Sequence, residues 1–344
     1  MRTLLNTLYV TSPDAYLSLD GENVVVLKGD QPAARVPLHN LEGIVTFGYT
    51  GASPALMGAC AQRDIALSFM AQNGHFLARV SGEVRGNILL RKTQYRWNED
   101  EGRSALIARN FILGKVYNAR WVLERATRDY ALRVNVERLK GVSQNLAAAL
   151  PHIASCEDLQ QLRGYEGEAA SQYFGVFDEL ILQQKESFSF RGRNKRPALD
   201  PVNALLSFVY TLLAHEVASA LETVGLDPYA GFLHRDRPGR ISLALDLMEE
   251  LRPVFADRFV LSLINKKMVA VEDFVKKEDG ALLLQDDGRR ALFGRLAGER
   301  KQETILHPYL QEKLEWGLVP YVQGLLLARY LRGDLDAYPP FLWK

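Results

Sequence analysis

The stretch Arg96-Trp97-Asn98-Glu99-Asp100-Glu101-Gly102-Arg103 separates two parts of the chain that differ in pattern. Before it, short apolar segments alternate with turn-forming pairs such as Asp20-Gly21, which is typical of β-strands. After it, long segments such as Leu106 to Leu132 repeat apolar residues at helical spacing. The sequence therefore predicts an α+β fold, with a β-rich domain at residues 1–90, a hinge or linker at 91–103 and a larger all-helical domain at 104–344.

The N-terminal part is expected to hold seven short strands and one helix. The helix runs from a Ser53 cap, with Pro54 at its first position, to Gln62. The expected strands cover residues 8–10, 16–19, 24–27, 34–36, 44–46, 66–69 and 76–80.

The composition is that of a globular protein with a substantial core, since 47% of its 344 residues are hydrophobic and 24% are charged. A formal net charge of +1 neither demands nor excludes nucleic acid, because local clusters of Lys and Arg decide phosphate binding. The start of the chain has no signal-peptide pattern, and no segment approaches the roughly 18 apolar residues of a membrane span. We expect a cytoplasmic protein without membrane contact, in which Cys60 and Cys156 are free buried thiols.

Glu166 lies where an apolar residue is expected. A helix over Leu159 to Ile181 places it on the apolar stripe, and Gly164 and Gly167 beside it suggest the close approach of another backbone or of a substrate. A buried carboxylate needs a cation. Either a salt bridge to Arg163 or a bound metal ion satisfies this requirement.

Asp246, Glu249 and Glu250 share an arc of about 100° on a helix whose other sides are apolar. Like charges held beside the interior have raised pKa values unless something positive intervenes. A divalent cation does this directly, with either Glu249 or Glu250 as the ligand.

His234 ends what is expected to be a short helix capped by Asp227, just before a loop that is able to fold back on the acidic helix. Its role is either structural or that of a metal ligand. One imidazole with carboxylate oxygens suits Mn²⁺ or Mg²⁺ better than a structural zinc ion.

Three basic segments are candidates for DNA binding, although such runs are often solvated faces. The position of these segments beside an acidic metal site favours the DNA-binding interpretation, because enzymes that act on phosphodiesters need cations to hold the DNA backbone. The candidates are Arg191, Arg193, Lys195 and Arg196, then Arg235, Arg237 and Arg240, then Lys266 and Lys267.

Other chemistries lack their motifs. His215-Glu216 begins like a zinc-protease helix, but the second histidine is missing. The sequence has no phosphate-binding glycine loop with lysine, no dinucleotide fingerprint and no nucleophile elbow.

At these residues the chain resembles a known family, the CRISPR-associated spacer-acquisition integrases, which are the first of the numbered Cas proteins. The subtype I-C branch is the most similar. The matching elements are Arg163 to Ala170 with Tyr173-Phe174, Asp200 to Phe208, Gly225 to Tyr229, Gly231 to His234, and Leu245 to Pro253, together with Leu8 to Thr11 and Leu38 to Leu41.

The resemblance implies an N-terminal β domain for dimerisation and partner contacts and a C-terminal helical catalytic domain. It also implies a divalent metal, Mg²⁺ or Mn²⁺, held by Glu166, His234 and Glu249, with Asp246 as a further catalytic acid close by. His234 is either a ligand or a general acid.

The resemblance further implies that such a protein is a metal-dependent DNA endonuclease and integrase. The 3′-hydroxyl of a short double-stranded fragment would attack a phosphodiester at a CRISPR repeat. Family members are homodimers that act with the second numbered Cas protein, and often with a RecB-like nuclease. The alternatives are a non-catalytic nucleic-acid scaffold and a repair nuclease for branched DNA.

Overall fold

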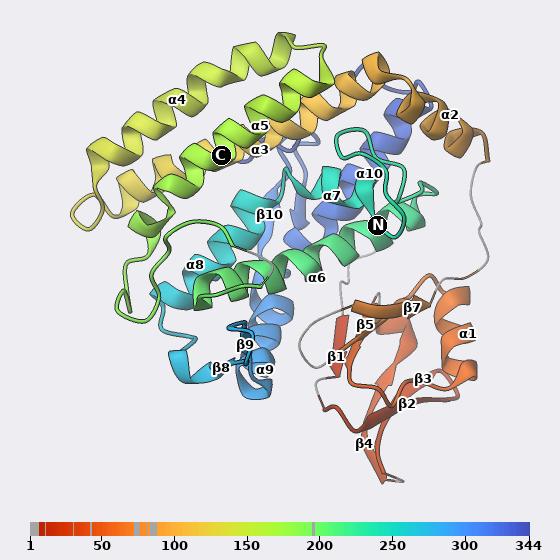
Figure 1. The fold of residues 1–344 in the computed structure, drawn as a ribbon. Coiled ribbons are helices and arrows are strands. Elements are labelled where there is room, and N and C mark those ends of the chain that lie inside the picture. Colours follow the sequence, from red (N-terminus) through yellow and green to blue (C-terminus); the bar gives the residue numbers. More distant parts are fainter. Residues whose placement is uncertain are drawn as a thin grey trace. The chain divides into compact units, whose positions relative to one another are not determined.

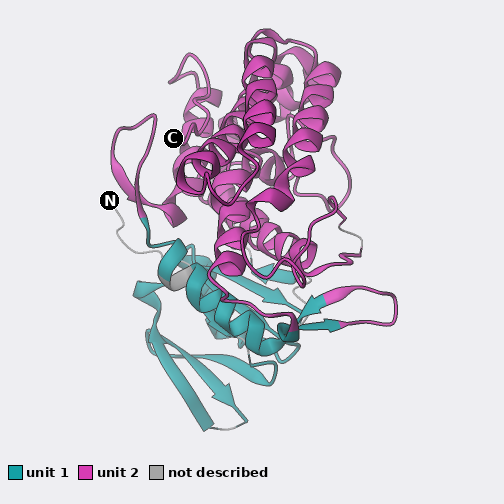
Figure 2. Cartoon of the chain, turned by 90° about the vertical axis from the view of Figure 1, so that its left-hand side faces the viewer, with its two compact units in different colours: residues 1–85, 272–275, 283–303 teal, residues 86–271, 276–282, 304–344 magenta. Residues whose placement is uncertain are grey.

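A computed structural model describes residues 7–10, 12–29, 31–41, 43–71, 76–80, 82, 88–194 and 197–344. Within them the chain forms two compact units, which Figure 2 shows in different colours. Unit 1 contains residues 1–85, 272–275 and 283–303, and unit 2 contains residues 86–271, 276–282 and 304–344.

The described residues between 7 and 82 form two sheets in unit 1, which confirms that the N-terminal part is β-rich. A mixed sheet has the strand order β1-β5-β6-β7, in which only the β6 and β7 pair is antiparallel, and β2, β3 and β4 form an antiparallel sheet. The bounds are β1 Thr7–Val10, β2 Ala15–Asp20, β3 Asn23–Lys28, β4 Gln31–Pro37, β5 Gly43–Phe47, β6 Ala66–Met70 and β7 Phe76–Val80.

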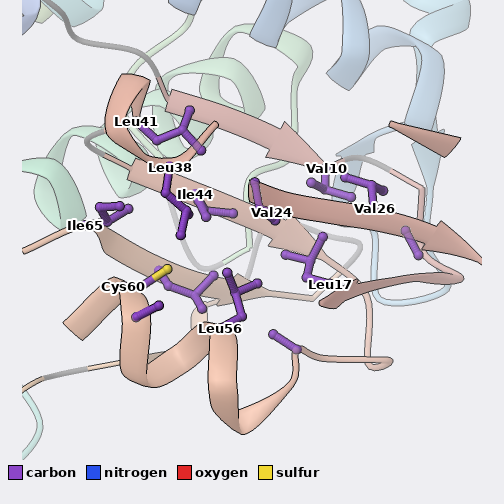
Figure 3. Close-up of a cluster of buried hydrophobic side chains, with 14 residues drawn as sticks. Val10, Leu17, Val24, Val26, Leu38, Leu41, Ile44, Leu56, Cys60 and Ile65 are labelled. Atoms are coloured by element: carbon purple, nitrogen blue, oxygen red, sulfur yellow. The ribbon is translucent and has the colours of Figure 1, made fainter. Parts of the chain in front are cut away.

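Helix α1 (Pro54–Gln62) closes the core of unit 1. It begins as predicted, because the Ser53 side chain accepts a hydrogen bond from the backbone of Leu56. Leu56 and Cys60 on this helix point into a buried cluster that includes Leu17 and Ile44 (Figure 3). Burial raises the pKa of the Cys60 thiol to about 11, so this cysteine is a packing residue, as expected.

Unit 2 is mainly helical. Helix α3 lies against α4 and α5, and α6 packs on α7 and α10 (Figure 1). The bounds are α2 Ile88–Glu99, α3 Glu101–Asp129, α4 Val136–Ser155, α5 Leu159–Gly175, α6 Pro201–Thr223, α7 Ser242–Met248, α8 Arg258–Asn265 and α10 Val319–Leu331.

Three predictions about domain organisation are wrong in detail. Residues 91–103 are not a linker, because they lie in α2 and at the start of α3. Asp100 caps α3 by accepting a hydrogen bond from the backbone of Arg103, so the polar stretch is a helix junction. The predicted all-helical part also contains strands β8 Phe274–Lys276, β9 Leu282–Leu284, β10 Thr304–Leu306 and β11 Lys313–Glu315, which are too short to give a sequence pattern.

The third difference concerns α9 (Asp286–Arg295), which belongs to unit 1 although it follows the long helices in sequence. The ring of Phe293 stacks on Tyr9, with centroids 4.7 Å apart, and lies 4.8 Å from the ring of Phe47. These aromatic contacts join residues 283–303 to the first sheet, so residues 104–344 are not one continuous domain.

Helix α6 is long and apolar enough to cross a membrane by length and composition alone, which the sequence analysis did not anticipate. However, 67% of its most apolar window is buried inside the protein. This is the pattern of a core helix, and its packing against α7 and α10 accounts for its composition.

Candidate metal and DNA site

Two of the predicted acidic residues, Glu166 on α5 and Glu249 at the end of α7, meet at a single cation. The Lys115 ammonium group, on α3, contacts Glu166 Oε1 and lies 2.7 Å from Glu249 Oε2. The two carboxylates are therefore within roughly 6 Å of each other, about two hydrogen-bond lengths. The alternative pairing of Glu166 with Arg163 is not found, because Arg163 donates to the carbonyl oxygen of Leu233 instead.

Lys115 and Glu249 are buried, whereas Glu166 is partly exposed, with 29% of its side chain accessible. Burial alone would lower the pKa of Lys115, but the charges of Glu249 and Glu166 outweigh it and raise that pKa above its usual value. Burial would likewise raise the pKa of Glu249, but Arg252, Lys115 and His234 together lower it to about 2. Glu249 is thus ionised, and its side chain is only 3% exposed.

Arg252 supplies the second positive charge at Glu249. Its guanidinium lies 3.1 Å from Glu249 Oε1 and 4.9 Å from the centre of the Tyr210 ring. Arg252 follows α7 in a π-helical segment, Arg252–Asp257, which turns this side chain back toward the acidic group. Two cations therefore neutralise the site where a divalent ion was expected.

Asp246 is fully buried and holds the turn that carries His234. Its carboxylate accepts hydrogen bonds from the backbone N–H groups of Phe232, Leu233 and His234, at 2.6, 2.9 and 3.0 Å. It also lies 2.5 Å from His234 Nδ1. This pairing leaves Nε2 as the ring nitrogen available to a ligand, the usual arrangement for a histidine oriented by a carboxylate. Asp246 is therefore a positioning residue in this structure.

The segment before His234 is a turn, and the predicted short helix does not form. Asp227 accepts a hydrogen bond from the backbone of Tyr229 and closes a tight turn instead of capping a helix. Gly231 allows the turn to approach α7, because a Cβ atom there would lie 2.8 Å from Asp246 Oδ2 and 2.9 Å from the backbone of Ser242. The hydrogen bonds that the turn donates to the Asp246 carboxylate thus take the place of the backbone hydrogen bonds that a helix would have formed.

Helix α2 clamps the same turn. The buried Gln94 side chain donates to the carbonyl oxygens of Asp227 and Ala230, at 2.7 and 2.9 Å, and accepts from the backbone N–H of Asp227. Asn98, one helical turn further on, donates to the carbonyl of Gly231. The position of His234 is thus fixed from two helices, α2 and α7.

Of the two neighbouring glutamates, Glu249 contacts Lys115, whereas Glu250 is held by the C-terminal segment. Its carboxylate accepts hydrogen bonds from Tyr338, at 2.5 Å, from Gln323, at 3.1 Å, and from the backbone of Phe341. Burial raises its pKa to about 8, although these hydrogen bonds oppose the shift. Glu250 anchors the C-terminal segment to the helical core.

A cleft of about 800 Å³ opens beside Glu166. Lys115 and Glu166 line it, and so do two predicted DNA-binding residues, Arg191 and Arg193. Arg193 is held by Asn203 and Ser207 on α6, at 2.5 and 3.1 Å, whereas Arg191 is exposed.

No other part of the described chain comes close to Gly164 and Gly167, where the sequence predicted a close approach by another backbone or by a substrate. A Cβ atom at either glycine would have nothing within 4 Å among the described residues. Gly167 lines the cleft, which leaves room above α5 for a substrate.

The remaining basic candidates are less closely tied to the cleft. Arg235 and Arg237 are exposed in the loop after His234, and Arg240 is partly buried there. Lys266 and Lys267 are exposed at the end of α8, and neither is among the residues that line the cleft. Lys195 and Arg196 lie outside the described residues.

A divalent cation fits this chemistry if Lys115 gives way. In the described residues, no group of three or more His, Cys, Asp and Glu side chains is arranged to hold a metal ion as it stands. However, Glu166 and Glu249 already share one positive charge, and His234 acts electrostatically on Glu249. Glu249 Oε2 is buried without a hydrogen-bond partner beyond its ion pair with Lys115, so this oxygen is able to serve as a ligand atom.

Sequence reasoning missed three residues of this site, Lys115, Arg252 and Gln94. Lys115 shares a face of α3 with the buried residues Phe111 and Ala119, four positions away on either side, so it is a charge on an apolar face. A charged residue on an apolar face was the pattern that pointed to Glu166, and the sequence shows the same pattern at Lys115. The role of Gln94 rests on backbone carbonyls far away in sequence and leaves no motif.

Comparisons with known proteins identify the family of this chain. The family model described as "CRISPR associated protein Cas1" matches residues 8–297. A "CRISPR-associated endonuclease Cas1 1" from Chlorobaculum tepidum is 49% identical, with both chains covered fully. A "CRISPR-associated endonuclease Cas1 2" from Rhodospirillum rubrum is 51% identical, also over the full length of both.

One longer relative is a fusion of two enzymes. It is a "CRISPR-associated exonuclease Cas4/endonuclease Cas1 fusion" from Geobacter sulfurreducens, 34% identical over 98% of this chain and 60% of its own length.

Solved structures share the fold. A "Casposase bound to integration product" gives a TM-score of 0.82 at 23% identity, covering 99% of this chain and 93% of its own. A CAS1 protein from Thermotoga maritima gives 0.81 at 22% identity, with 97% and 99% coverage. A "Cas6-RT-Cas1--Cas2 complex" gives 0.80 at 21% identity, covering all of this chain and 36% of the other. With a family model matched over most of its length and full-length relatives near 50% identity, the chain belongs to the Cas1 family of CRISPR-associated proteins.

Proposed function

We propose that this protein is a metal-dependent DNA endonuclease and integrase that inserts short DNA fragments into a CRISPR array. One observation carries the proposal. Glu166 and Glu249, from different helices, converge on one cation, Lys115, at the edge of a cleft that three arginines line, Arg191, Arg193 and Arg252. Full-length relatives named as Cas1 endonucleases support the same activity.

The proposed ligands of a Mg²⁺ or Mn²⁺ ion are Glu166, Glu249 and His234 Nε2. When bound, the ion supplies Lewis-acid activation of the scissile phosphate and of the attacking 3′-hydroxyl. Asp246 keeps His234 in one orientation through Nδ1. Lys115 leaves the carboxylates and remains at the cleft wall, where its ammonium group is available to a phosphate oxygen.

The chain's own residues also position the DNA. Arg191 and Arg193 line the same cleft as Glu166 and contribute positive charge for the phosphate backbone. We include Arg235, Arg237, Arg240, Lys266 and Lys267 as further backbone contacts. Such contacts fix the register of the duplex, and DNA shape adds specificity.

The proposed partners are a second copy of this chain, the second numbered Cas protein and a RecB-like nuclease, with the β-rich domain providing dimer and partner contacts. The likeness to a structure titled as a Cas1–Cas2 complex and the Cas4/Cas1 fusion support the latter two. We place the protein in the cytoplasm, where its DNA targets are.

A strand-transfer assay on a repeat-bearing plasmid with Mn²⁺ tests the proposal. Glu166→Gln and Glu249→Gln should abolish fragment insertion while the circular dichroism spectrum and duplex binding persist. Glu168→Gln is the matched control, because Glu168 is exposed on the same helix. Full insertion by Glu166→Gln would refute the assignment.

The two rival functions make different predictions in the same experiments. A non-catalytic scaffold needs no stoichiometric Mn²⁺ in a calorimetric titration. A branched-DNA repair nuclease cleaves branched substrates but inserts nothing into the repeat-bearing plasmid.

A further inference from the structure

The C-terminal segment, residues 338–343, is packed against the helix junction that carries Glu249. Tyr338 is 1% exposed and Phe341 is fully buried. The Tyr338 hydroxyl lies 2.5 Å from Glu250 Oε1, and the backbone N–H of Phe341 donates to Glu250 Oε2. Glu250 directly follows the proposed metal ligand Glu249, so the C-terminal segment holds the chain beside that ligand.

Asn118 ties the same segment to α3. Its fully buried amide donates to the carbonyl oxygens of Glu250 and Phe341, at 2.7 and 2.8 Å, and accepts from the backbone N–H of Trp343, at 2.9 Å. Lys115, the cation between the two carboxylates, lies three residues earlier on α3. One side chain therefore joins the C-terminal segment, the helix of Lys115 and the junction after α7.

The end of the segment reaches the other side of this junction. The guanidinium groups of Arg125, on α3, and of Arg258, at the start of α8, each lie 4.4 Å from the centre of the Trp343 ring. Arg258 directly follows the π-helical segment Arg252–Asp257. The C-terminal segment thus contacts the chain on both sides of the π-helical segment, at Glu250 and at Arg258, and links both sides to α3.

The junction needs such support because it is not a continuous α-helix. Helix α7 ends at Met248, Glu249 is its C-terminal cap, and the π-helical segment begins at Arg252. Turns of π-helix are rare and occur frequently at functional sites. An interrupted helix does not by itself fix the direction of the chain that follows, so the positions of Glu249 and Arg252 depend on what holds the junction.

The C-terminal segment acts from a distance. Among the residues that line the cleft beside Glu166, none belongs to residues 338–343. Arg125, which contacts Trp343, is about 15 Å along α3 from Lys115 at 1.5 Å per residue. An effect of Trp343 on the carboxylate site therefore has to pass through α3 and the junction.

We propose that the C-terminal segment positions Glu249 and Arg252 by clamping the junction after α7 against α3. The residues of the segment are positioning residues, because they touch neither the cleft nor the proposed metal ligands. The inference rests on the proposed function in taking Glu249 as a metal ligand. Weakening the clamp should therefore loosen the junction, lower metal affinity and slow turnover.

Hydrogen exchange measured in EDTA tests the clamp without metal or DNA. Trp343→Leu removes the ring that Arg125 and Arg258 contact, so peptides from residues 249–257 should exchange about tenfold faster than in the wild type. Peptides from α4 should exchange at the wild-type rate, whereas a general loss of stability would accelerate both. Wild-type exchange of residues 249–257, or equal acceleration of α4, would overturn the proposal.

Titration with Mn²⁺ by calorimetry gives the second readout. Trp343→Leu and Tyr338→Phe should each raise the Kd for Mn²⁺ about tenfold, the lower end of the effect of groups that support metal ligands. Trp343→Phe keeps a ring for the two guanidinium groups and should stay within about twofold of the wild type. The stability control is Ile153→Val, a fully buried position on α4, which should keep the wild-type Kd.

Strand-transfer kinetics separate positioning from DNA binding. Trp343→Leu should lower kcat about tenfold and leave KM for the DNA fragment unchanged, because its effect is confined to the junction. A raised KM with an unchanged kcat would contradict the clamp.

The two binding-independent outcomes are distinguishable. If the wild-type protein binds no Mn²⁺ but Trp343→Leu accelerates exchange of residues 249–257 alone, the clamp stands and the metal assignment fails. If the wild type binds Mn²⁺ and Trp343→Leu changes neither exchange nor Kd, the clamp is refuted and the metal assignment stands. Circular dichroism checks that each variant is folded.

Discussion

Replacing Lys115 by methionine removes the cation that Glu166 and Glu249 share in this structure. The two carboxylates then face each other at about 6 Å, and their repulsion is about 3 kcal/mol at an effective dielectric constant near 20. Lys115→Met should therefore lower the free energy of unfolding by about 3 kcal/mol in EDTA, which corresponds to a fall in Tm of roughly 5–10 °C.

Mn²⁺ should reverse most of this loss. In the wild-type protein the metal has to displace the Lys115 ammonium, whereas in Lys115→Met the carboxylate pair is open. At a metal concentration 100 times Kd, binding adds about 2.7 kcal/mol of stability, close to the amount lost. Thermal unfolding with and without Mn²⁺ measures both effects, and the shift caused by Mn²⁺ should be larger in the variant.

Lys140→Met is the matched control. Lys140 pairs with Glu124, but its side chain is 45% exposed, and such exposed pairs contribute about 1 kcal/mol or less. The control should lose little stability and show the wild-type response to Mn²⁺. If Lys115→Met is as stable as wild type in EDTA and gains no more from Mn²⁺, the shared-cation interpretation is wrong.

Three further variants, one of them with a control on α4, probe the groups around the site. In chemical denaturation, Gly231→Ala should lose about 2 kcal/mol of stability, because its Cβ would lie 2.8 Å from Asp246 Oδ2. The control Gly141→Ala on α4, where a Cβ atom meets open space, should gain roughly 0.5–1 kcal/mol. Asp246→Asn should weaken Mn²⁺ binding about 10–100-fold by calorimetry, since the turn and the imidazole of His234 lose their anionic partner; unchanged affinity would contradict this role. Burial raises the pKa of Glu250 from 4.5 to about 8 in the folded protein, so the folded state is favoured while this carboxyl is protonated. The Tm of the wild-type protein should therefore decline as the pH rises from about 5 to 8, and Glu250→Gln should flatten that decline. Equal pH profiles for the two proteins would show that Glu250 is already ionised.

The sequence pattern was sufficient to predict the strands of the N-terminal part and the unusual positions of Glu166 and of the acids at 246–250, whereas the pairing of Glu166 with Glu249 was implied by the family resemblance. Both rest on local periodicity, which strands of four to seven residues and long helices preserve. The assignment of residues 283–303 to unit 1 depends on Phe293 stacking against Tyr9, a contact between distant positions that no local pattern records.

The acidic helix shows the limit of periodicity more clearly. Asp246, Glu249 and Glu250 do share an arc, but a fully buried helix has different neighbours on every side. Asp246 faces the His234 turn, Glu249 faces Lys115, and Glu250 faces the C-terminal segment at Tyr338. Their three environments raise one pKa to about 8 and lower another to about 2, which no spacing rule distinguishes.

Anomalous diffraction from crystals of this protein soaked in Mn²⁺ tests the central claim most directly. We predict a manganese peak bound by the carboxylates of Glu166 and Glu249 and by His234 Nε2, with the Lys115 ammonium displaced from between the two acids. A peak bound elsewhere, or Lys115 still bridging Glu166 and Glu249 at saturating Mn²⁺, would contradict the account.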